Sequence, residues 1–167
     1  MSKEMSKEYL FFFSEKSTNG YLSNWYPSKF DDGFITYQNM EQYMMYQKAL
    51  TFGDMDMATK IMKNSNPEVC KKLGRQVRNF DPMIWSNKCM YIVTRGCLLK
   101  FNQNPNLKQF LIATGDCILV EASPYDRIWG IGYSASNAVK VDKIKWGQNL
   151  LGKCLMKVRE TLSKTAT

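Results

Sequence analysis

The 167-residue chain contains no histidine. This absence excludes every mechanism that uses an imidazole as its base, so acid and base chemistry falls to carboxylates, lysine or tyrosine. The five cysteines form no C-x-x-C pair and have no histidine with which to complete a zinc site. They are therefore predicted to be reduced and mostly buried, and neither a metal nor another cofactor is expected.

Long apolar runs are also missing. No segment approaches the roughly 20 apolar residues that span a bilayer, and the start, MSKEMSKEYLFFF, mixes acidic residues with its lysines. A soluble, cytoplasmic protein without a membrane partner is expected. The chain has no G-x-G-x-x-G or P-loop string, which argues against nucleotide binding of the Rossmann or Walker type.

Positive charge is in excess and unevenly distributed. The formal net charge is +8, and residues 60–100 and 140–167 carry +7 and +5 of it, offset by the rest of the chain. Such blocks favour partners that bear phosphates, whether nucleotides or nucleic acid. The alternative for any single lysine is a solvated side chain that only keeps the protein soluble.

The length suits one domain, and the pattern of apolar residues predicts an α+β fold that is predominantly helical with a few short strands. Strands are expected within 9–14, on either side of the Asp-Asp-Gly turn in 29–37, and within 116–124. Helices are expected over 39–53, 55–65, 67–77, 82–101, 105–115 and 146–162. Residues 1–8 are expected to form a flexible N-terminus, 9–162 the domain and 163–167 a C-terminal tail.

The first candidate for chemistry is the pair Glu41 and Lys48 in the helix predicted for 39–53. Seven residues are close to two helical turns, so both side chains face the same way, about 10 Å apart along the axis. Apolar neighbours such as Tyr43, Met44 and Met45 would desolvate the lysine and lower its pKa toward a neutral, nucleophilic amine. The alternative is a surface pair that flanks a core stripe.

The second candidate is EASPYDRIWGIG, residues 121–132. A strand delivers Glu121 to its end, Pro124 turns the chain, and glycines in the following loop allow close backbone approach. Arg127 is suited to pair with a phosphate or carboxylate, and Trp129 to stack on a base. Alternatively, Asp126 caps the turn and Trp129 belongs to the core.

Three further residues are weaker candidates. Trp85 lies on the helix predicted for 82–101, where a tryptophan is either a ligand platform or core. Arg75 follows Gly74 in the basic block and either holds a phosphate or is solvated. Asn24 lies in the turn-rich stretch before the first helix, next to Trp25.

An ordered series of motifs resembles the NADAR family, also called the YbiA-like or DUF1768 family. The motifs are LSNWYP (22–27), NMEQYMMYQKA (39–49), FGD (52–54), LGRQVRNFD (73–81), Trp85, KF (100–101), LIATGD (111–116), LVEASPYDRIWGIG (119–132) and NLLGKCLMKVR (149–159). The resemblance covers about Tyr9 to Arg159. It departs at Gln148, where the family pattern has an acidic residue before the asparagine.

The resemblance implies an N-glycosidase that cleaves the bond between ribose C1 and an amine nitrogen. Its implied substrates are ADP-ribose attached to guanine, in DNA, RNA or guanosine compounds, or ribosylamine phosphates of riboflavin synthesis. A third hypothesis is a module that binds ADP-ribose without turnover. The matching site positions are Glu41, Lys48, Trp85, Glu121, Ser123, Asp126 and Trp129.

Two mechanisms are compatible with these residues. In the preferred one, Lys48 forms a Schiff base with the sugar while Glu41 or Asp126 carries protons. In the other, two carboxylates act directly and Lys48 only binds phosphate. In either, Trp85 and Trp129 would stack on the ligand, Arg127, Arg75 and Arg78 would bind phosphates, and Glu121, Ser123 and Asn24 would bind the substrate.

Overall fold

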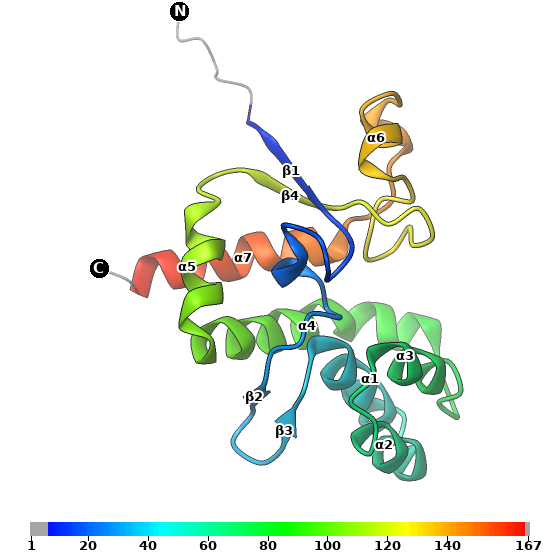
Figure 1. Cartoon of the computed structure of the whole chain (residues 1–167). Coiled ribbons are helices and arrows are strands. Elements are labelled where there is room, and N and C mark those ends of the chain that lie inside the picture. Colours follow the sequence, from blue (N-terminus) through cyan, green and yellow to red (C-terminus); the bar gives the residue numbers. More distant parts are fainter. Residues whose placement is uncertain (1–6, 166–167) are drawn as a thin grey trace, which may run out of the picture. The chain divides into compact units, whose positions relative to one another are not determined.

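The computed structural model describes residues 7–165, which form two compact units (Figure 1). Unit 2, residues 24–108, contains β2 (Phe30–Asp31), β3 (Thr36–Tyr37), α1 (Met40–Thr51), α2 (Met55–Met62), α3 (Pro67–Gly74) and α4 (Pro82–Gln103). Unit 1 combines the segment up to Ser23 with residues from 109 onward. It contains β1 (Tyr9–Phe12), β4 (Ile118–Glu121), α6 (Ala135–Ala138) and α7 (Leu150–Thr165), and α5 (Pro105–Ala113) runs across the division between the units.

The helices of unit 2 begin where polar side chains cap them. Asn39, Asp54, Asn66 and Asp81 each accept a hydrogen bond from a backbone N–H in the first turn of the helix that follows. Proline occupies the first turn of both α3 and α4, where its missing N–H costs nothing. These local signals confirm the predicted starts of all four helices.

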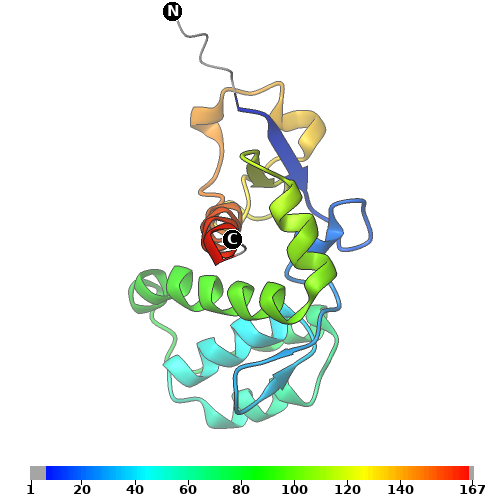
Figure 2. The same cartoon turned by 90° about the vertical axis from the view of Figure 1, so that its left-hand side faces the viewer.

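Helix α1 is the centre of unit 2. It packs against α2, α3, α4 and β3, so residues 40–45 are buried on every side of the helix. Its contact with α4 is visible in both views (Figure 1, Figure 2). Met40, Tyr43 or Met44, and Gln47 recur at a spacing that predicts one inward stripe on this helix. That prediction is wrong because neighbours cover its other faces as well.

Glycines set how closely these helices approach. A Cβ at Gly96 of α4 would lie 2.3 Å from a ring carbon of Tyr43, and one at Gly74 would lie 1.9 Å from the sulfur of Met45. A methyl group at either place would force Tyr43 or Met45 to move. The Tyr43 hydroxyl donates to the Ile92 carbonyl at 2.8 Å, which joins the same two helices.

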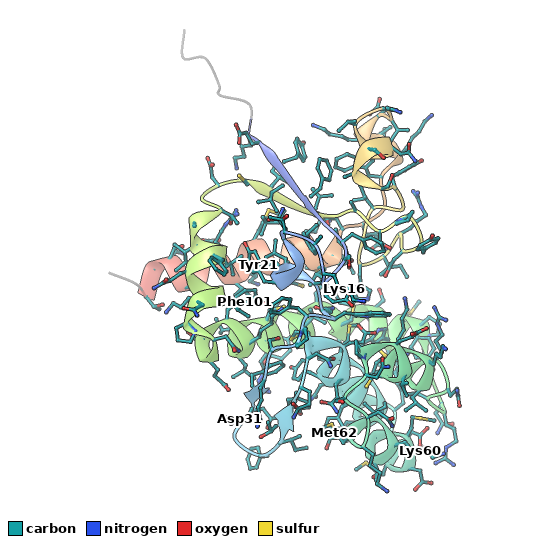
Figure 3. All side chains as sticks on the ribbon, viewed as in Figure 1. Lys16, Tyr21, Asp31, Lys60, Met62 and Phe101 are labelled. Carbon is teal, nitrogen blue, oxygen red and sulfur yellow. The ribbon has the colours of Figure 1, made fainter. Side chains whose placement is uncertain are left out.

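The β2–β3 hairpin is held at the C-terminal end of α4. Gln103 accepts from the Asp31 N–H at 2.8 Å and donates to the Asp31 carbonyl at 2.8 Å. Asp31 lies on this hairpin and Phe101 on α4, in the last turns of the helix (Figure 3). Asp32 closes the turn by accepting from Phe34 and Ile35 N–H groups, as the Asp-Asp-Gly signal predicts.

Unit 1 is built on a parallel pair of strands. β1 runs beside β4 with Tyr9 opposite Ile118 and Phe12 opposite Glu121. The amphipathic helix α7 packs against β4. Its buried face contains Arg159 and five apolar side chains, namely Leu151, Cys154, Leu155, Val158 and Leu162.

A second apolar cluster of unit 1 contains side chains from both strands, the residues after β4 and the segment around α6. It comprises Tyr9, Phe11, Ile118, Val120, Ile131, Tyr133, Ala138 and Trp146. The short helix α6 and the 3₁₀ turn at Lys143–Lys145 were not anticipated from the sequence. Both are too short to produce a helical periodicity.

The last helix begins later than its sequence predicts. The expected helix starts at Trp146, but α7 starts at Leu150. Residues 147–151 instead donate backbone hydrogen bonds to the carbonyls of residues 127–131. These tertiary bonds replace the first helical turn.

At the chain ends, α7 continues through Thr165, and residues 1–6 of the expected N-terminal segment and 166–167 of the expected tail lie outside the described residues. Among residues 7–165, no helix is both long and apolar enough to cross a membrane.

The close approach at Gly96 predicts that Gly96→Ala destabilises the protein by about 1–3 kcal/mol, because the added methyl group overpacks the contact with Tyr43. Urea unfolding measures this change. Asn87→Ala is the control: it lies on the exposed side of the same helix and should change the free energy of unfolding by less than about 0.5 kcal/mol. Equal stability of both variants would contradict the predicted overpacking.

Candidate active site

The amine of Lys48 lies against an aromatic pair. Its Nζ atom is 4.4 Å from the centre of the Phe80 ring, and Phe80 packs edge-on to Phe52 with centroids 5.3 Å apart. Phe52 immediately follows α1, and Phe80 immediately precedes the residue that caps α4. The Phe80 ring therefore covers one side of the amine, and Phe52 packs against that ring.

Burial lowers the pKa of Lys48 below the ordinary lysine value, the charge of Glu41 opposes that shift, and the charge of Arg75 lowers the pKa further. The coupling to Glu41 fits the prediction that positions 41 and 48 face the same way on one helix. A lower pKa means more neutral amine at a given pH, and the neutral amine is the nucleophile.

Glu41 lies in the first turn of α1 and is 5% exposed. Its backbone N–H donates to the Asn24 carbonyl at 3.0 Å, so the turn-rich stretch before β2 reaches the start of the helix. A carboxylate near a helix N-terminus is favoured by the helix dipole. Asn24 and Glu41, which lie in separate segments of the sequence, are therefore neighbours in the structure.

Asn24 has a feature that suits a binding residue. It is 6% exposed, and within residues 7–165 its side-chain oxygen Oδ1 has no hydrogen-bond partner. Buried polar atoms are nearly always satisfied, so an orphan of this kind indicates a place for a water molecule or a ligand hydroxyl.

Cys70, whose thiol is influenced by the charge of Glu41, is unsuited to nucleophilic attack. Cys70 is fully buried and donates to the Asn64 carbonyl at 3.2 Å. Burial, with a smaller contribution from the Glu41 charge, raises the pKa of Cys70 to about 11. Burial also raises the pKa of Cys89. Both keep the thiol protonated, as expected for structural cysteines, and the described cysteines form no disulfide.

The other candidates of unit 2 lie at helix ends. Arg75 is the C-terminal cap of α3 and is exposed, and its charge reaches Lys48. Trp85 is half-buried in the first turns of α4, where its backbone N–H donates to the Asp81 carbonyl at 3.0 Å. Unit 2 therefore brings together Asn24, Glu41, Lys48 and Arg75 through pairwise contacts or charge coupling.

In unit 1, Asp126 organises the loop that follows β4. Its Oδ1 atom accepts from the N–H groups of Ile128 at 2.8 Å and Trp129 at 2.9 Å. The turn-capping alternative for this residue is thus realised, but through one oxygen only. Within the described chain Oδ2 accepts no hydrogen bond, so it remains available for proton transfer.

The remaining candidates of this loop have definite places. Ser123 is 5% exposed and its hydroxyl accepts from the Tyr125 N–H at 3.3 Å. Glu121 ends β4 and is half-buried, and Trp129 is half-buried as well. Arg127 donates to the Lys145 carbonyl at 2.7 Å and lies over the Tyr133 ring at 5.8 Å, so it contributes to the loop structure.

Asn149 is a positioning residue that the sequence reasoning missed. Its side chain accepts from the Glu121 N–H at 3.0 Å and donates to the Leu119 carbonyl at 2.9 Å, while its own N–H donates to the Gly130 carbonyl at 3.1 Å. It therefore joins the end of β4 to the far side of the loop. Its positive φ of 51° is a conformation that asparagine tolerates, but nothing in the string WGQN announces it.

The NADAR domain family matches residues 11–163. N-glycosidase R617 of Acanthamoeba polyphaga mimivirus is 51% identical over 145 residues, which cover 83% of this chain and 85% of that protein. Riboflavin biosynthesis protein VVA0006 of Vibrio vulnificus is 28% identical over 94% of this chain and 39% of that protein.

A solved structure is also similar. The NMR structure of the E. coli protein YbiA superposes with a TM-score of 0.79 at 26% identity, covering 97% of this chain and 89% of that one. This match confirms the predicted fold class, a mostly helical α+β domain with few short strands.

The coupling of Arg75 to Lys48 generates a prediction about titration. The Lys48 amine should titrate below the ordinary lysine value of about 10.4, and Arg75→Gln should move its midpoint to higher pH because a repelling positive charge is lost. Nuclear magnetic resonance of the Lys48 Cε atom measures this midpoint directly. Arg75→Lys keeps the charge and should stay near the wild-type midpoint; the same midpoint in both variants would exclude the coupling.

The two side-chain hydrogen bonds of Asn149 predict that Asn149→Gly lowers the free energy of unfolding by about 1–3 kcal/mol, since it leaves backbone groups of β4 and the loop unpaired. Glycine keeps the positive φ, so only the side chain is tested. The matched control is Asn79→Gly, at an exposed asparagine with φ 59°. Urea denaturation should give a lower midpoint for Asn149→Gly than for Asn79→Gly. Equal midpoints would refute the stabilising role of the two Asn149 side-chain hydrogen bonds.

Proposed function

The chain belongs to the NADAR family and is an N-glycosidase, and from that premise we propose that it removes ADP-ribose from the exocyclic amine of guanine. The observation that carries the proposal is the lowered pKa of Lys48 beside the Phe80 ring and within the field of Glu41. A binding module has little use for such an amine. The phosphate-rich substrate also suits a chain of net charge +8.

In the proposed reaction, the ribose ring first opens: the ring oxygen gains a proton and C1 forms an imine with the guanine nitrogen. The neutral Nζ of Lys48 then attacks C1. The bond between C1 and the guanine nitrogen then breaks, and this nitrogen takes up a proton, so guanine leaves with its neutral amine. The sugar remains on Lys48 as a Schiff base. Water adds to C1, the C1–Nζ bond breaks, and ADP-ribose closes its ring as the free amine is restored.

Two carboxylates are proposed to carry the protons. Glu41 is favoured by its charge coupling to Lys48, and Asp126 by the oxygen left available when Oδ1 caps the turn. The same carboxylate that protonates the departing nitrogen can then accept a proton from the attacking water. The direct mechanism has no covalent step and needs both carboxylates to act on the bond. In it, Lys48 would only bind a phosphate.

The remaining candidates are proposed to bind substrate. Trp85 and Trp129 would stack on the bases, and Arg75 would bind a phosphate while its charge depresses the pKa of Lys48. Glu121, Ser123 and the unsatisfied oxygen of Asn24 would accept from ribose hydroxyls, and Arg127 would hold a phosphate near the loop. No metal or cofactor takes part in this scheme.

A second candidate is hydrolysis of ribosylamine phosphates of riboflavin synthesis. It is favoured by the similarity to the Vibrio vulnificus riboflavin biosynthesis protein. The bond that breaks is of the same kind, a ribose C1 joined to an amine, and the same amine and carboxylates would serve. The leaving group and the number of phosphates distinguish the two substrates.

Product analysis tests the substrate. The purified protein is incubated with ADP-ribosylated guanosine and, separately, with the pyrimidine ribosylamine phosphate. Release of ADP-ribose supports the first candidate and release of ribose 5-phosphate the second. Tight binding with no release from either substrate would leave only a module without turnover.

The Schiff base predicts that Lys48→Arg loses at least about 100-fold in kcat, because a guanidinium keeps its charge and cannot act as the nucleophile. Under the direct mechanism the same variant would retain most activity, since it still binds phosphate. Borohydride added during turnover should leave the sugar covalently on Lys48, as detected by peptide mass spectrometry. An active Lys48→Arg enzyme with no trapped adduct in the wild type would refute the covalent route.

A further inference from the structure

The outer face of α4 carries an ordered stripe of exposed side chains. Ile84, Lys88, Tyr91 and Arg95 follow one another at spacings of four, three and four residues, so they lie on one face of the helix. All four are exposed, and Tyr91 is 75% exposed. We refer to these four residues as the α4 stripe.

The stripe is positive and has no compensating charge on its own helix. All 22 residues of α4 lack aspartate and glutamate. In the described chain Lys88 and Arg95 form no ion pair, whereas Lys72 is paired with Glu68, and Arg78 with Asp54 and Asp56. Residues 60–100 contain nine lysines and arginines against two carboxylates, and all nine except the buried Lys100 are at least partly exposed. Such a surface concentrates phosphate-bearing ligands.

Tyr91 lies between the two cations, about one turn from each along a helix that rises about 1.5 Å per residue. Lys88 and Arg95 are thus about 10 Å apart along the axis. An exposed ring flanked by cations is the arrangement that binds single-stranded nucleic acid, because unpaired bases stack on the ring while phosphates contact the cations. Paired bases offer no free face for such stacking.

The helix that carries the stripe begins just after Phe80, the residue that contacts the candidate nucleophile. Phe80, whose ring lies 4.4 Å from the Lys48 amine, is followed directly by Asp81, which caps α4 through the N–H groups of Met83 and Ile84. Ile84, the first member of the stripe, is therefore four residues along the chain from Phe80, which contacts the amine. A strand whose guanine occupies the site would be able to continue along α4.

We propose that the α4 stripe binds the single strand that carries the modified guanine, with one base stacked on Tyr91 and neighbouring phosphates on Lys88 and Arg95. The inference rests on the proposed function. The exocyclic amine of guanine lies on its base-pairing edge, so a sugar attached there disfavours pairing and leaves the flanking bases accessible. An acidic peptide would use the two cations but would gain nothing from the ring.

The binding test uses fluorescence anisotropy of an unmodified, 5′-fluorescein-labelled single-stranded DNA 12-mer with a central guanine. Lys88→Gln/Arg95→Gln should weaken binding at least about 10-fold and reduce the slope of log K against log salt by about 1.4, the value for two lost contacts to a single strand. Tyr91→Ala should weaken it about 5- to 100-fold, and Tyr91→Phe should bind as the wild type does.

The matched control is Lys60→Gln/Lys63→Gln, which removes the same charge from exposed positions of α2 and the residue after it; Lys60 is labelled in Figure 3. This control should bind the 12-mer within about twofold of the wild type. The stripe is overturned if the control weakens binding as much as the stripe variants, if the wild type does not bind the 12-mer, or if an acidic peptide binds with the same dependence on Tyr91.

Turnover separates this inference from the function on which it rests. The stripe variants should raise KM for an oligonucleotide that contains ADP-ribosylated guanine and leave kcat/KM for ADP-ribosylated guanosine unchanged. If the variants hydrolyse both substrates as the wild type does, the proposal that the stripe binds the strand is wrong and the proposed function stands. If the wild type releases ADP-ribose from neither substrate, the proposed function fails, and the stripe loses its role as a substrate site with it.

Discussion

The burial of α1 is the constraint on which unit 2 depends. Three helices and a strand pack around it, so its charged residues lie partly or wholly outside water. A lysine in that position is held in a medium that disfavours its charge, and the nearby Glu41 limits the shift without cancelling it. The packing that stabilises the unit therefore also favours the neutral form of the amine.

In unit 1 the corresponding constraint is the backbone of the loop after β4. Residues 147–151 hold the loop through hydrogen bonds to residues 127–131, and Asn149 ties it to the strand. A Cβ at Gly147 would lie 2.4 Å from the Arg127 carbonyl, and one at Gly130 would lie 2.9 Å from that of Glu121. The polar side chains of the loop are presented by a backbone that packing and hydrogen bonds fix.

In a chain without histidine, burial is the main influence on the pKa values of Lys48, Cys70 and Cys89. The thiols of Cys70 and Cys89 move away from reactivity because burial opposes the charged thiolate. The same effect moves Lys48 toward reactivity, because in an amine the neutral form is the nucleophile.

The sequence by itself determined the starts of α1 to α4, because a capping side chain bonds to backbone groups two or three residues away. It also determined that Glu41 and Lys48 share a helix face. Only the tertiary structure decided that α1 is covered on all sides, that Phe80 lies beside Lys48, and that residues 146–149 leave the last helix to hold the loop. These features join residues distant in the chain, and no local pattern records which distant groups will compete for a hydrogen bond or an apolar surface.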